Sequence, residues 1–73
     1  MKTFKVGDVV EVEDARGELL RRRALTDVVD GRDFEIVWVC RVEEWAAAQK
    51  EGREPDKVPW PAEDVHPLRA EPD

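Results

Sequence analysis

One dipeptide constrains the fold of this chain more than any other feature. Asp30-Gly31 separates two segments, residues 18–29 and 32–42, that are rich in β-branched and aromatic side chains. An Asp-Gly pair between such segments is the strongest short-range signal for a β-hairpin. Three consecutive arginines in the first segment are also compatible with a helix, but the Asp-Gly signal favours strands. The sequence therefore predicts one long hairpin.

The loop of this hairpin fixes which side chains face each other. A two-residue loop places Leu25 opposite Ile36 and Arg23 opposite Trp38. Because side chains alternate along a strand, one face holds Leu19, Arg21, Arg23, Leu25, Phe34, Ile36, Trp38, Cys40 and Val42, and the other holds Leu20, Arg22, Ala24, Val28, Val37, Val39 and Arg41. Both faces are substantially apolar, whereas a strand that is buried on one side alternates more cleanly. We therefore expect another element to cover the second face, or the sheet to curl into a barrel.

The segment before the hairpin predicts a first strand and a turn. Residues 4–13 carry valines at even spacing, and Gly7-Asp8 near their start indicates a kink or a bulge. The four residues that follow begin with Asp14 and end with Gly17. Aspartate bonds back to the backbone and glycine accepts a positive φ, so these residues are expected to form a tight turn.

Strong helix formers follow the hairpin. Residues 43–51 begin with two glutamates and carry Lys50 in the last turn, charges that suit the two ends of a helix. Gly52 is a candidate for the C-cap. A helix this short is unstable alone, so we expect Trp45 to dock it on the sheet.

The C-terminal part is less regular. Residues 52–61 predict a proline-rich loop, and the sequence leaves open whether a strand exists between 52 and 60. Residues 61–68 predict a single tight helical turn followed by a short last strand. The charged tail, about 70–73, is expected to fray.

Length and composition exclude most chemistry. The chain has 73 residues, which predicts a single domain over 1–73. It contains no Ser, Asn or Tyr, one His and one Cys. Cys40 lies in an apolar run and is expected to be a small buried hydrophobe. We therefore expect no enzymatic activity, no catalytic residue, no metal site and no cofactor.

Charge and hydropathy limit the partners. The chain has 12 basic and 18 acidic side chains, a net charge of −6, and most of the excess acid lies in residues 43–73. Nucleic-acid binding normally needs a basic surface, so the expected partner is another protein rather than a nucleic acid. The acidic region either keeps the chain in solution or steers it towards a basic partner. A membrane span needs about 20 apolar residues, far more than any run here, and the N-terminus lacks the apolar region of a secretory signal. We expect a cytoplasmic protein without membrane contact.

The order of these elements resembles a known fold. VGDVVEV at 6–12, the hairpin around Asp30-Gly31 and WPAEDVHPL at 60–68 together look like a small SH3-like β-barrel of the Tudor or KOW type. The resemblance implies a mostly β barrel of about five strands, with one short helix inserted after the third strand. Residues 43–59 depart from the simple hairpin of that family. The bias for Arg over Lys and the abundance of Val, Ala, Asp and Glu also resemble small accessory proteins of actinobacteria or their phages.

Tryptophan and arginine side chains are the candidate binding residues. Trp38, Trp45 and Trp60 could form an aromatic groove for a cation or a peptide, as in Tudor-type barrels, or they could all belong to the core. Arg21 and Arg23 share a predicted face with Trp38, where they bind a partner or remain a solvated surface. Arg23 is expected to form a cation–π pair with the Trp38 ring.

The expected function is that of a non-enzymatic binding module, an accessory protein that a phage could encode. It is expected to bind another protein either through the hairpin surface around Arg23 and Trp38 or through the region of Trp45 and Trp60. Aromatic anchors would give affinity and charge would give orientation. Two alternatives stay open. One is a nucleic-acid-associated module of the Tudor or KOW type, against which the net charge argues. The other is a structural or assembly component of a phage particle, which weak homo-oligomer formation would favour.

Overall fold

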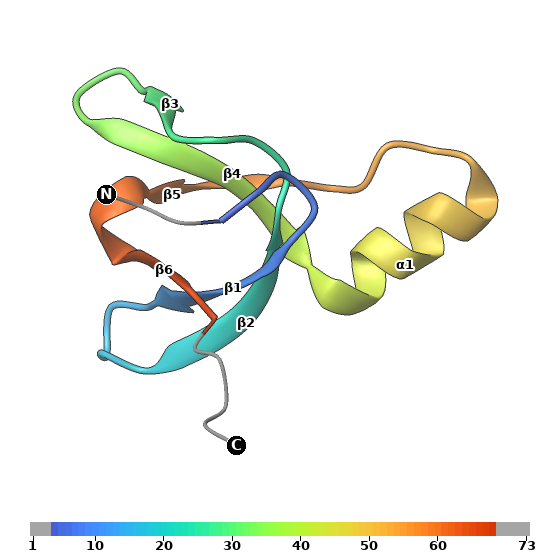
Figure 1. Ribbon diagram of the computed structural model, residues 1–73, viewed down its shortest axis with the longest axis horizontal. Helices are drawn as coiled ribbons and strands as arrows, with labels where there is room; N and C mark the ends of the chain where they lie inside the picture. Colours follow the sequence, from blue (N-terminus) through green and yellow to red (C-terminus); the bar gives the residue numbers. More distant parts are fainter. Residues whose placement is uncertain (1–3, 69–73) are drawn as a thin grey trace.

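The computed structural model describes residues 4–68 of the chain, and the tail whose fraying was predicted, 70–73, lies outside this range (Figure 1). Within it, six strands, one α-helix and one 3₁₀ turn follow one another along the chain. In chain order they are β1 (Val9–Glu13), β2 (Leu19–Ala24), β3 (Val29–Asp30), β4 (Glu35–Arg41), α1 (Val42–Glu51), β5 (Val58–Pro61), η1 (Ala62–Asp64) and β6 (Val65–Pro67).

The strands form a single curled sheet with β4 at its centre. β4 pairs with β2 and β3 along one side and with β5 along the other, and β1 lies between β2 and β6. All of these pairs are antiparallel, and the sheet curls into half a barrel (Figure 1). The predicted mostly β fold with one short helix is thus confirmed, and its shape is compatible with an SH3-like barrel. The helix follows β4 because the expected second strand is divided into β2 and β3.

Small aliphatic side chains fill the concave, inner face of the sheet. The buried cluster consists of Val10, Val12, Ala24, Val37, Val39, Ala62 and Val65, and its partly buried neighbours are Phe4, Leu20, Val28 and Trp60. Burial of a valine contributes about 1.5–3 kcal/mol. The largest fully buried side chains of the described residues are valines, so this core depends on many small contributions.

The long hairpin forms, but its predicted register is wrong. The loop is longer than Asp30-Gly31, because Gly31 donates its N–H to the carbonyl oxygen of Phe34 at 2.9 Å, and a Cβ on Gly31 would collide with that oxygen. Arg23 consequently lies opposite Cys40 rather than opposite Trp38. The displacement is an even number of residues, so the side chains that pair in these strands keep their predicted faces.

The same hairpin is also interrupted. Residues 25–28 leave the ladder between β2 and β3. Val29, expected next to the loop, pairs with Ile36. The hydroxyl of Thr26 accepts a hydrogen bond from the Trp38 N–H at 3.2 Å, and this side-chain bond replaces a backbone bond of the predicted strand.

The first strand starts later than its valines suggest. The N–H of Asp8 donates to the carbonyl oxygen of Lys5 at 2.9 Å, so the predicted kink is a complete turn and β1 begins at Val9. The tight turn after β1 is confirmed, since Oδ1 of Asp14 accepts the N–H groups of Arg16 and Glu18 at 2.8 and 3.0 Å.

Helix α1 matches its prediction closely. Gly52 adopts a left-handed conformation with φ of 69° and donates its N–H to the carbonyl oxygen of Ala48, which is the arrangement expected of a glycine C-cap. The helix projects from the end of β4 and away from the barrel (Figure 1). It has 10 residues, and no helix in the described range is long and apolar enough to cross a membrane.

A strand lies where a loop was predicted. β5 pairs with β4, with Trp60 opposite Val37 and Pro59 opposite Trp38. Proline has no N–H, so prolines at two alternate positions, Pro59 and Pro61, fit only a strand whose corresponding edge is free. The tight turn and last strand after β5 are confirmed as η1 and β6.

Candidate binding surface

The three tryptophans lie in three different environments. Trp60 points to the inner face, packs against the core, and donates its indole N–H to the carbonyl oxygen of Glu13 at 3.0 Å. It therefore links β5 to the end of β1 across the barrel, which is a structural position. Trp38 lies on the outer face of β4, and Trp45 lies on α1. The structure does not bring the three rings into one aromatic groove.

Arg23 joins the helix to the sheet. Its guanidinium lies 4.3 Å from the centre of the Trp45 ring, and its Nη1 donates to the carbonyl oxygen of Gly7 at 2.7 Å. The predicted pair of Arg23 with Trp38 is therefore wrong, because the longer loop moves Trp38 along the strand and brings Trp45 over Arg23 instead. A cation–π contact of this kind contributes about 0.5–2 kcal/mol. The expected docking of Trp45 on the sheet is confirmed.

The arginine triplet does not form one patch. Arg21 is exposed on the outer face, opposite Glu11 of β1. Arg22 points to the opposite face, where its neighbours in the ladder are Val10 and Arg41. This separation follows directly from strand alternation.

An apolar surface remains on the outer face of β3, β4 and β5. Ile36 lies between Val29 and Pro61, and in the next row Trp38 lies beside Pro59. These five residues, with Leu25 next to Trp38, define what we call the Trp38 face. Helix α1 projects away from this part of the sheet (Figure 1), and Val29 and Pro59 are exposed.

Two hollows border the Trp38 face. One, of about 240 Å³, is lined by Leu25, Thr26, Glu54, Pro55 and Lys57, and the other, of about 220 Å³, by Phe34, Glu35, Pro61, Ala62 and Glu63. The ammonium of Lys57 lies 5.2 Å from the centre of the Trp38 ring, which shows that this ring accepts a cation. Together the two hollows are lined by three carboxylates and one cation, Lys57.

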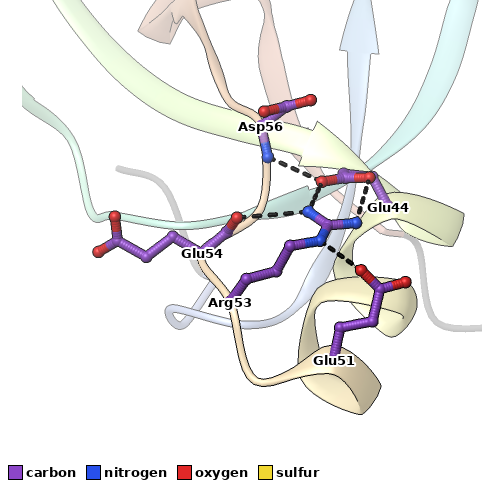
Figure 2. A network of polar contacts seen from close by, with 5 residues as sticks. All are labelled: Glu44, Glu51, Arg53, Glu54 and Asp56. Carbon is purple, nitrogen blue, oxygen red and sulfur yellow. Dashed lines mark hydrogen bonds and ion pairs between the residues drawn. The ribbon is translucent and has the colours of Figure 1, made fainter.

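An ion-pair network fixes the segment that carries Lys57 (Figure 2). Both Nη atoms of Arg53 donate to the carboxylate of Glu44, at 2.5 and 3.3 Å, and its Nε donates to Glu51 at 2.7 Å. The same Glu44 carboxylate accepts the N–H of Asp56 at 2.9 Å. The network ties residues 53–56 to α1 and so positions the rim of the Trp38 face.

These contacts determine the protonation of the network. The hydrogen bond from Arg53, followed by that from the Asp56 N–H, lowers the pKa of Glu44 to about 2. The hydrogen bonds to Glu44 and Glu51 raise the pKa of Arg53 further above its usual range. This network was not predicted from the sequence. The basic residue just after the helix was its only signal, because nine positions separate Glu44 from Arg53.

Cys40 is buried, as predicted, on the side of β4 near α1. Burial, and secondarily the charge of Glu44, raises the pKa of its thiol. A thiol in such surroundings stays protonated at neutral pH and is a poor nucleophile. Among residues 4–68, no three His, Cys, Asp or Glu side chains gather in an arrangement that could hold a metal ion.

A third hollow, of about 340 Å³, opens where β4 meets α1. Its lining residues are Arg22, Val39, Cys40, Arg41, Glu44, Asp56, Lys57, Val58 and Trp60. Arg22, Val39, Val58 and Trp60 belong to the inner face of the sheet. Cys40 and Lys57 belong to the side of β4 that carries Trp38, so the pocket opens at the end of the strand between the two faces.

Comparison of the chain with protein-family models, with curated proteins and with solved structures finds no significant match.

Proposed function

We propose that the protein is a non-enzymatic binding module, a small cytoplasmic accessory protein that binds another protein on the Trp38 face. The observation that carries the proposal is the outer surface of β3, β4 and β5, where apolar side chains in adjacent rows surround a tryptophan. Tryptophan at the centre of an apolar patch is typical of interaction hot spots. The likeness to Tudor- and KOW-type barrels, which act as binding modules, agrees with this assignment.

The charges around the Trp38 face favour a basic partner. Glu54, Glu35 and Glu63 line the two hollows, against the single cation Lys57. The net charge of −6 adds to this negative electrostatic potential. Complementary charge increases the association rate and selects the partner. We therefore propose that the occupant is a segment with lysine or arginine next to apolar side chains.

The same negative potential disfavours a second copy of the chain and a nucleic acid as occupants of the Trp38 face. Two copies of a chain with net charge −6 repel each other, which argues against self-association through an acidic rim. Phosphate groups are repelled as well, and nucleic-acid affinity depends mainly on neutralising them. The Lys57 ammonium already lies over the Trp38 ring. A lysine or arginine of the basic partner would take this position in its place.

Fluorescence polarisation with a labelled peptide tests the proposal. The probe is a short peptide of alternating lysine and leucine, and a glutamate–leucine peptide of equal length is its control. We expect the lysine peptide to bind and the glutamate peptide not to bind. Trp38→Ala should weaken binding at least tenfold, as truncation of a hot spot does, whereas Leu19→Ala, a matched change of an exposed apolar residue at the far end of β2, should not.

Charge variants keep the test independent of folding. Glu35→Lys and Glu54→Lys change exposed side chains, so they should leave the circular dichroism spectrum unchanged, reduce affinity and reduce its dependence on salt. Equal binding by the Trp38→Ala and Leu19→Ala proteins would refute the proposal. A concentration-dependent mass in sedimentation that is lost in Trp38→Ala would assign the face to a second copy instead.

A further inference from the structure

Two arginines face each other across the sheet, and in the described part of the chain only one of them, Arg41, has an ion pair, with the exposed Glu43. Arg22 of β2 and Arg41 of β4 are direct partners in the ladder. Like charges at directly opposite positions of an antiparallel pair destabilise it. An unfavourable pair of this kind is explained most simply by an anion that both side chains bind.

The hydrogen bonds that these two side chains make leave them available. Arg22 donates from Nη1 to the carbonyl oxygen of the adjacent Arg21 at 2.7 Å. Arg41 pairs with Glu43 at 3.0 Å, but the side chains of that pair are 71% and 73% exposed. Exposed pairs contribute about 0–1 kcal/mol, so this one is easily exchanged for a better partner.

Both arginines line the pocket of about 340 Å³ at the junction of β4 and α1. Its wall includes Val39, Val58 and the Trp60 ring. The volume lies within the range of small-ligand sites, which combine apolar walls with a few convergent polar groups. The pocket therefore offers two guanidinium groups next to a surface for an apolar group.

Among the residues that line the pocket, three cations face two carboxylates. Glu44 also lines it, but Arg53 and the Asp56 N–H engage both oxygens of the Glu44 carboxylate (Figure 2). The ammonium of Lys57 is turned to the Trp38 ring. The carboxylate of Asp56 lines the pocket and has no ion pair among the described residues. Apart from the exposed pair of Arg41 with Glu43, two arginines thus stand against one carboxylate without an ion pair.

We propose that this pocket binds a carboxylate attached to an apolar group, with the carboxylate between Arg22 and Arg41 and the apolar group on Val58 and Trp60. Guanidinium groups bind carboxylates through paired, charge-assisted hydrogen bonds. A protein supplies this chemistry either as the C-terminus of a chain or as an acidic side chain beside an apolar one. The residues proposed to hold this ligand lie on the opposite face of β4 from Trp38, so the proposal does not depend on the function proposed for the Trp38 face.

Proton–nitrogen correlation spectra of the whole chain test the site. Acetyl-leucine presents a terminal carboxylate, acetyl-glutamyl-leucinamide presents a side-chain carboxylate, and acetyl-leucinamide presents none. We expect the Trp60 indole signal to shift with one or both carboxylates and not with acetyl-leucinamide. The stronger of the two carboxylate ligands identifies the source. Equal shifts with all three compounds, or none at millimolar ligand, would overturn the proposal.

Variants of the triplet supply a matched control. Arg22→Gln and Arg41→Gln should each weaken binding at least tenfold, while Arg21→Gln, the adjacent arginine on the outer face, should leave it unchanged. Equal losses in Arg21→Gln and Arg41→Gln would contradict the proposal.

Stability of the free protein gives a second, independent measurement. Because like charges oppose each other, Arg22→Gln or Arg41→Gln should raise the urea midpoint of the unliganded chain. A fall in that midpoint would show that the two guanidinium groups are compensated within the chain, and would overturn the proposed site.

Discussion

Replacement of Trp60 by phenylalanine tests whether one indole group closes the barrel. The change keeps an aromatic ring on the inner face and removes the N–H that donates to the carbonyl oxygen of Glu13 at 3.0 Å. A hydrogen bond of this kind contributes about 0.5–1.5 kcal/mol. The smaller ring also leaves roughly 40 Å² of apolar contact unfilled, which costs about 1 kcal/mol at 25 cal/mol per Å².

The two contributions together predict a loss of about 2 kcal/mol in the free energy of unfolding. A domain of this size is stabilised by roughly 4–11 kcal/mol in total, so the loss is a large fraction. The corresponding fall in Tm is about 8–16 °C. Urea and thermal unfolding followed by circular dichroism measure both quantities without depending on tryptophan fluorescence.

Trp38→Phe is the matched control, because Trp38 lies on the outer face and its indole donates no hydrogen bond among the described residues. We expect it to cost less than about 1 kcal/mol. If Trp60→Phe and Trp38→Phe destabilise the protein equally, the indole bond to Glu13 does not close the barrel and the reasoning fails.

Three further predictions concern the core, the network and the helix end. Val12→Ala removes two buried carbons and should cost about 2–3 kcal/mol in urea unfolding, whereas a cost under about 0.5 kcal/mol would place Val12 outside the core. Because the pKa of Glu44 is lowered from its ordinary value of 4.5, the contribution of this carboxylate to stability is complete above pH 4.5 and is lost as the pH falls toward about 2. The urea midpoint of Glu44→Gln should therefore fall less with acid than that of the original chain. Parallel curves of urea midpoint against pH would contradict this. Gly52→Ala places a side chain at φ of 69° and should cost about 1 kcal/mol by thermal unfolding, while an unchanged Tm would show that the left-handed cap is dispensable.

Local signals in the sequence predicted the local structure well. The Asp14 turn and the Gly52 cap depend on backbone bonds within a few residues, and both form as predicted. The division of the hairpin into two faces was also correct, because it depends only on alternation. It survived the register error because the displacement was even.

Contacts between distant segments could not be read from the chain. Arg23 meets Trp45 only because β2 pairs with the end of β4, from which helix α1 starts. Arg53 meets Glu44 only after the chain reverses at the cap. The strand β5 was missed because prolines normally exclude a strand, and its edge position is a property of the assembled sheet. Trp38 was predicted as a binding residue, whereas the register that surrounds it with Ile36 and Pro59 was not.

The prolines of β5 have a consequence for how this molecule can meet others. Many proteins recruit an extended peptide as an additional strand, which requires backbone donors along an exposed border. Along β5, the amide positions that point outward belong to Pro59 and Pro61, which have no hydrogen to give. Strand addition and fibril growth along the β5 edge are therefore blocked. A partner of this protein has to bind to side chains on the faces of the sheet.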